Sequence, residues 1–145
     1  MPFTFSHPAV ILPFTKVKPQ WFSLTALFIG SLAPDFEYFL RMKMYGNYSH
    51  TLEGVFVFNL PLVIALSFLY HSIVRNHFID NLPNALYNRL APYKAFNWSK
   101  YFAKHFMVVI LSAIVGVFSH IIWDSLPMAM VFLLRGYGGL KAHFI

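Results

Sequence analysis

Two stretches of the chain are apolar over a length that can cross a lipid bilayer. Residues 54–74 contain no Asp, Glu, Lys or Arg, and residues 105–123 form a second such run that ends before Asp124. A helix rises 1.5 Å per residue, so about 20 residues cross the roughly 30 Å of hydrocarbon. Pro61 is tolerated inside the first run, because membrane helices can satisfy the freed carbonyl by other contacts. The pattern predicts an all-α, polytopic helical membrane protein with two strong spans.

Shorter apolar segments predict further helices that do not cross on their own. Residues 20–33 are apolar but too few to span the hydrocarbon. Pro34 is expected to kink this helix or to start a second one over residues 35–40. Whether the combined segment crosses the membrane or re-enters it stays open. A last apolar piece is predicted at residues 128–134, after Pro127.

The segment between the two spans is basic. Residues 75–104 hold five Lys or Arg against one acid, Asp80, and are predicted to form a basic loop at the membrane interface. The positive-inside rule places this loop on the cytoplasmic side of the membrane. Two antiparallel spans then bring His50 to the same, opposite side as His120 and Asp124.

Composition excludes an ordinary soluble domain and favours one membrane domain over residues 1–145. The chain is 58% hydrophobic and only 11% charged, whereas soluble domains carry about 25% charged residues. The net charge of +6 comes from basic residues that flank apolar segments. This placement predicts the lipid bilayer as the partner, and not nucleic acid. Cys is absent, which rules out disulfides and thiolate metal ligands.

Scarce ionisable groups give the first candidate for chemistry. His120 and Asp124 are four residues apart, so on a helix both side chains lie on one face, one turn from each other. An imidazole and a carboxylate in this arrangement form a two-ligand clamp for zinc or a similar ion. The same pair can also be a simple hydrogen bond between two buried polar groups.

Other polar residues at segment ends extend this candidate. Asp35 and Glu37 follow a proline at the start of a helical turn, where free N–H groups favour carboxylates. His50 precedes the first strong span, and His7 lies in the proline-rich N-terminal segment. Asp35 as a helix cap and His7 as an interfacial anchor are the simpler interpretations. If the segment ends converge, the predicted metal ligands are His7, Asp35, His50, His120 and Asp124.

Four motifs resemble those of an uncharacterised family of bacterial membrane proteins, defined only as a domain of unknown function. They are MPFTFSHPAVILPF, IGSLAPDFEYFL, SHTLEG and SHIIWDSL, in this order over nearly the whole chain. The resemblance implies a polytopic helical protein and brings no established activity. It also implies longer typical members, so one interpretation is a chain shortened at its C-terminus.

The order of motifs H … PDxE … SHT … HxxxD also resembles, more distantly, that of membrane-bound metal-dependent hydrolases, zinc-dependent phospholipase C and related single-strand nucleases. It implies that the five predicted ligands hold one or two divalent ions, with zinc expected, and that Asp35 doubles as a general base. The chain departs from these families in two places. The phospholipases have a later HxxxE pair, and the membrane hydrolases have an HRG before the THS-like motif; this chain has neither.

Three hypotheses follow. The first is a membrane-embedded metal-dependent hydrolase that acts on phospholipid or a lipid-linked phosphoester, with Asp35 or Glu37 as the catalytic proton acceptor. The second is a non-enzymatic membrane protein, such as an ion or proton path, a transporter component or an assembly factor. The third is a purely structural role, in which the polar residues join helix to helix.

Overall fold

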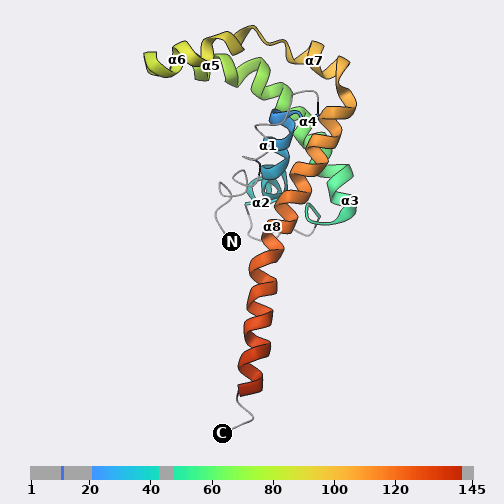
Figure 1. The fold of residues 1–145 in the computed structure, drawn as a ribbon. Coiled ribbons are helices and arrows are strands. Elements are labelled where there is room, and N and C mark those ends of the chain that lie inside the picture. Colours follow the sequence, from blue (N-terminus) through green and yellow to red (C-terminus); the bar gives the residue numbers. More distant parts are fainter. Residues whose placement is uncertain (1–10, 12–20, 43–47, 142–145) are drawn as a thin grey trace.

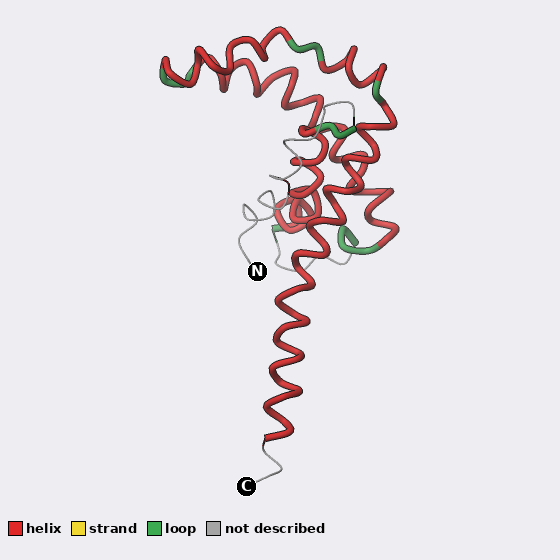
Figure 2. The backbone as a smooth tube through the Cα atoms, in the orientation of Figure 1, coloured by secondary structure: helices red, strands yellow, loops and turns green. Residues whose placement is uncertain are grey.

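The computed structural model describes residues 11, 21–42 and 48–141, with side chains up to residue 126, and the described part is helical without any strand. Figure 1 shows the helices in chain order, and Figure 2 shows how little of the described backbone lies in loops. The helices are α1 (Leu24–Leu32), α2 (Phe36–Arg41), α3 (Leu52–Gly54), α4 (Leu60–Leu69), α5 (Arg75–Asp80), α6 (Asn84–Leu90), α7 (Trp98–Lys104) and α8 (Phe106–Lys141).

Two helices are long and apolar enough to cross a membrane, as the sequence predicts. The first runs without interruption over Leu52–Asp80, through α3, α4 and α5 and two π-helical turns, Val55–Asn59 and Tyr70–Val74. The second lies over Phe106–Leu126 in α8. The π turn before Pro61 supplies an alternative backbone pattern next to a residue that cannot donate a hydrogen bond. The predicted all-α, polytopic membrane fold is confirmed.

The segment 20–40 forms two short helices. A 3-10 turn, Ala33–Asp35, separates α1 from α2, with Pro34 inside it. The nine residues of α1 rise only about 14 Å, which is too little to cross the bilayer. Met42 ends α2 in a left-handed conformation, with φ of 50°. The break predicted at Pro34 is therefore confirmed.

The expected separation at Pro127 is wrong. α8 continues as one helix from Phe106 to Lys141, and its C-terminal half extends beyond the other helices (Figure 1). A proline removes the N–H of its own position only, so a long helix can continue through it when its other hydrogen bonds are made.

The central contact of the fold is the close approach of α1 to α8. A Cβ atom on Gly30 would lie 2.6 Å from the carbonyl oxygen of Ala113, and one on Gly116 would overlap the carbonyl oxygen of Leu27. Only glycine on both helices lets the two backbones touch in this way. The start of α1 is fixed to the same face of α8, because the backbone N–H of Ser23 donates to Ser112 Oγ at 2.8 Å.

A small core continues from this contact toward α4 and α7. Its buried residues are Ala26, Ala33, Val55, Val63, Trp98, Val109, Ala113 and Val117. Many larger apolar side chains of the two long helices point outward instead, among them Phe56, Val57, Leu111 and Val115. Outward-facing apolar groups on such long helices are what a lipid environment requires.

Replacing Gly116 by Val is expected to separate α1 from α8. The added side chain has no space at the Leu27 carbonyl, so the free energy of unfolding should fall by roughly 1–3 kcal/mol. Thermal unfolding of the purified protein in detergent measures the change. Val115→Leu is the matched control, because Val115 is exposed on the neighbouring position of α8. Equal melting temperatures for the two variants would contradict the close contact.

Candidate metal centre

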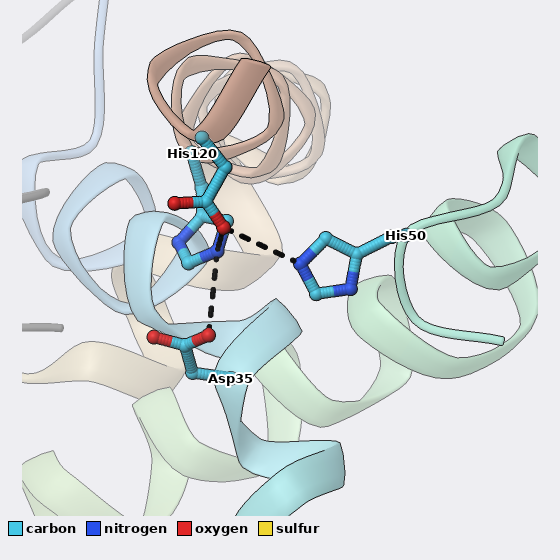
Figure 3. Close-up of side chains that lie close together, drawn as sticks. Asp35, His50 and His120 are labelled. Carbon is cyan, nitrogen blue, oxygen red and sulfur yellow. Dashed lines mark ion pairs between the residues drawn. The ribbon is translucent and has the colours of Figure 1, made fainter. Parts of the chain in front are cut away.

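Four of the predicted ligand residues meet at one point. Asp35, His50, His120 and Asp124 each offer one ligand atom, and these atoms all lie within 4.8 Å of one another. They come from three separate parts of the fold: the 3-10 turn after α1, the turn before α3, and α8. Figure 3 shows the side chains of Asp35, His50 and His120 pointing toward one another.

The nitrogen and oxygen atoms of this group are spaced at similar distances from one another. His120 Nε2 lies 3.5 Å from Asp35 Oδ1 and 3.4 Å from Asp124 Oδ2, and His50 Nε2 lies 3.8 Å from the same Asp124 oxygen. A charge-assisted hydrogen bond between nitrogen and carboxylate is shorter, about 2.7–2.9 Å. Four tetrahedral ligands about 2.1 Å from a zinc ion are separated by about 3.4 Å. The observed spacing therefore fits atoms that surround an ion better than atoms that bond to one another.

The ring of His120 is held in the orientation that a metal ligand needs. Its side chain is fully buried, and Nδ1 lies 2.7 Å from the carbonyl oxygen of Ser31 on α1. A carbonyl only accepts hydrogen bonds, so Nδ1 carries a proton, and in a neutral ring Nε2 would then hold the lone pair that a metal needs. A backbone carbonyl on the second nitrogen is the usual partner of a metal-binding histidine. The close approach of α1 to α8 thus fixes the tautomer of His120.

His50 presents its ring to the group in a similar way. Its Nδ1 lies 3.0 Å from Ser49 Oγ, and its Nε2 is buried and has no hydrogen bond to the residues that the structure describes. The rings of His50 and His120 are 5.5 Å apart between centroids. Both histidines therefore direct Nε2 toward the two carboxylates.

Glu37 supports the turn that carries His50. Its side chain is buried, and Oε2 accepts the backbone N–H groups of Tyr48 at 3.2 Å and Ser49 at 2.7 Å. Its other oxygen, Oε1, accepts from Arg41 Nη1 at 2.8 Å. Glu37 lies outside the four-residue group, and these contacts give it a role in positioning His50; its predicted role as a proton acceptor is untested.

The same turn is held from its other side by the start of the first long helix. Asn59 is fully buried and donates through Nδ2 to the carbonyl oxygen of Ser49 at 2.6 Å. Gly54 lets the turn fold back on the helix, because a Cβ there would overlap the carbonyl oxygen of Tyr48. Thr51 caps the helix by accepting the N–H of Gly54. The turn is thus fixed at both its N–H and its C=O groups.

Tyr38 is a residue at the centre that the sequence analysis did not single out. Its ring centroid lies 5.6 Å from that of His50. Burial raises the pKa of the Tyr38 phenol above its usual value of 10.0, and the nearby carboxylates, Asp35 foremost, raise it further. The phenol therefore stays neutral at physiological pH and can donate a hydrogen bond. The signal in the sequence was its position, one helical turn after Asp35 in PDFEY.

The remaining predicted residue is His7, which lies outside the described residues. Glu53, the other acid close to His50 in sequence, is exposed at the start of α3 and does not belong to the group. Two-span geometry predicted that His50 shares one side with His120 and Asp124, and the structure brings these three residues together with Asp35. Their role as metal ligands stays a prediction.

Replacing Glu37 by Ala is expected to destabilise the His50 turn. The buried N–H of Ser49 loses its acceptor, which should lower the free energy of unfolding by roughly 1–3 kcal/mol. Thermal unfolding in detergent measures the loss, and Glu37→Gln should recover part of it because one acceptor oxygen remains. Glu53→Ala is the control, since Glu53 is exposed. An equal loss of stability in the two Ala variants would argue against a stabilising role of the hydrogen bonds between Glu37 and the His50 turn.

Comparison with known proteins gives one family. The model of the family described as Domain of unknown function (DUF4184) matches residues 1–144. Neither a curated protein nor a solved structure matches the chain. The resemblance to an uncharacterised family is confirmed, while the more distant resemblance to metal-dependent hydrolases stays a prediction. Since the match covers nearly the entire sequence, the chain belongs to the DUF4184 family.

Proposed function

We propose that this protein is a membrane-embedded, metal-dependent hydrolase in which Asp35, His50, His120 and Asp124 hold a divalent ion, with zinc expected. The observation that carries the proposal is the meeting of four ligand atoms within 4.8 Å, from three separate segments of the chain. Two imidazoles and two carboxylates are a ligand set that suits zinc. Ionisable groups in membrane segments are costly, and those that are present usually pair with one another or bind an ion.

The proposed chemistry divides the work among the residues. A divalent ion held by these residues would supply Lewis-acid chemistry, because it would lower the pKa of a water molecule and polarise a phosphoryl or carbonyl oxygen. His120, His50 and Asp124 serve as ligands. Asp35 serves as both a ligand and a proton acceptor. Its carboxylate has a second oxygen beside the one that faces His120, whereas the carboxylate of Glu37 accepts backbone hydrogen bonds from the His50 turn.

A lipid phosphoester is the proposed class of substrate. His50 lies two residues before Leu52, where the first long helix begins, and Asp124 lies two residues before Leu126, where the second apolar stretch ends. Both positions support a site near one surface of the membrane, where phospholipid headgroups lie. We place the protein in the bacterial plasma membrane, with the basic segment 75–104 in the cytoplasm and the metal centre on the opposite side.

A second candidate function is a proton or ion path without turnover. It is favoured by the arrangement of His120, which is fully buried and lies between two carboxylates, while Asp124 also reaches His50. Groups linked in this way can relay a proton. The two functions differ in their need for a metal.

Metal content is the first test. The purified parent protein should hold about one zinc or manganese ion per chain, measured by elemental analysis after supplementation. His120→Ala/Asp124→Ala should hold none, because two ligands on one face of α8 are lost. The matched control, His77→Ala/Glu53→Ala, removes one exposed histidine and one exposed acid outside the group and should keep the ion. A parent protein without metal would refute the metal centre.

Turnover is the second test. Release of the headgroup from phospholipid in mixed micelles should stop with a chelator and return with zinc. Asp35→Asn keeps an oxygen ligand but loses the base, so at saturating zinc its rate should fall by about 10²–10⁴-fold.

Proteoliposomes loaded with a pH-sensitive dye distinguish the alternative. A proton flux that is unchanged by the chelator and absent in His120→Ala would favour the proton path over the hydrolase.

A further inference from the structure

The basic segment 75–104, here called the arm, begins with the last turns of the first long helix, where a buried arginine binds the returning chain. Arg75 donates to the carbonyl oxygens of Phe96 at 2.8 Å and Lys94 at 3.1 Å. The ring of His71 stacks on Trp98 with centroids 4.5 Å apart and planes within 8°. These contacts join the outgoing helix to the returning chain. The arm therefore leaves the helical body with a defined direction.

That direction is across α8. Figure 1 shows α5 and α6 extending to one side, across the direction of α8 and near its N-terminal end. His71 is 19 residues after Leu52, which is about 28 Å along a helix and close to the thickness of the hydrocarbon layer. The arm thus lies at the opposite end of the spans from the metal centre, where the other membrane surface is expected.

The arm carries uncompensated positive charge. It holds five Lys or Arg and a single acid, a net charge of +4. Asp80 is bound by Lys94 Nζ at 2.5 Å, a hydrogen bond that raises the pKa of Lys94. Arg75 is buried, so three exposed cations remain for which the arm offers no second carboxylate: Arg89, Lys100 and Lys104.

The arm also exposes large apolar side chains beside these charges. Phe78 and Leu86 are about half exposed, at 55% and 48%, and Tyr93 is exposed at 64%. An open groove of about 460 Å³ runs along α5 and is lined by Ile73, Val74, His77, Phe78, Asn81 and Leu82. Apolar and cationic groups together on helices at the edge of a membrane are typical of segments that lie in the headgroup region.

We propose that the arm is a docking surface for anionic phospholipid. Arg89, Lys100 and Lys104 contact lipid phosphates, while Phe78 and Leu86 insert among the upper parts of the acyl chains. Charge complementarity selects anionic over zwitterionic lipid, since each basic residue near a negative leaflet adds to the attraction. The proposal is independent of the metal centre, because the two surfaces lie at opposite ends of the spans.

The chain contains no Cys, so a single introduced thiol reports on one position. Leu86→Cys is labelled with a fluorophore and reconstituted in vesicles of phosphatidylcholine and phosphatidylglycerol at a ratio of about 3:1. Brominated acyl chains on one lipid or the other quench the label by contact. Quenching by brominated phosphatidylglycerol should exceed quenching by brominated phosphatidylcholine, with a relative association constant of about 5–10. High salt should lower this ratio.

The charge variant is Arg89→Gln/Lys100→Gln/Lys104→Gln, in which the ratio should fall close to 1. The matched control is Lys43→Gln/Arg135→Gln/Lys141→Gln, which removes the same number of charges outside the arm and should keep the parent ratio. Three results would overturn the proposal: a label that neither lipid quenches, equal quenching by both lipids in the parent, or an equal loss in the control. Self-quenching that grows with protein per vesicle would instead indicate a second copy of the chain on the arm.

Discussion

The close contact between α1 and α8 is the constraint on which the rest of the structure depends. Two glycines, Gly30 and Gly116, let the backbones touch. One residue after Gly30, the carbonyl of Ser31 receives the Nδ1 proton of His120, which lies one turn after Gly116. The packing of two helices and the orientation of a candidate metal ligand are therefore the same interaction. A larger residue at either glycine would move the carbonyl away from the ring.

His50, the second candidate ligand, is held in place by different hydrogen bonds. His50 lies in a turn, where a backbone is normally mobile. Here the buried carboxylate of Glu37 accepts hydrogen bonds from two backbone N–H groups of that turn, and Asn59 donates a hydrogen bond to the carbonyl oxygen of Ser49 in the same turn. A buried acid is costly unless its hydrogen bonds are made, so the brace is stable only while the turn keeps its shape. Side chains on two helices thus hold His50 in a fixed position although it lies in a turn.

The two ends of the long helices carry different chemistry. At one end, two carboxylates and two imidazoles gather within 4.8 Å of one another. At the other, Arg75 joins the arm to the helix and exposed cations lie beside apolar side chains. A membrane has two surfaces with different lipids and potentials, and a protein that crosses it can use a separate set of contacts at each. This polarity follows from the antiparallel course of the two spans in the described part of the chain.

The sequence by itself determined the helical membrane fold, the two spans and the partnership of His120 with Asp124, because apolar length and four-residue spacing are local properties of a helix. It also indicated that Asp35 and His50 lie at segment ends that can converge. It did not reveal that Glu37 braces the His50 turn, that α8 continues through Pro127, or that Tyr38 faces the centre. The spacing of Ser112, Gly116, His120 and Asp124 was a usable signal for the face of α8 that meets α1. Only the tertiary structure decided which carboxylate joins the candidate ligands and which supports the His50 turn, because that choice depends on distances between segments far apart in the chain.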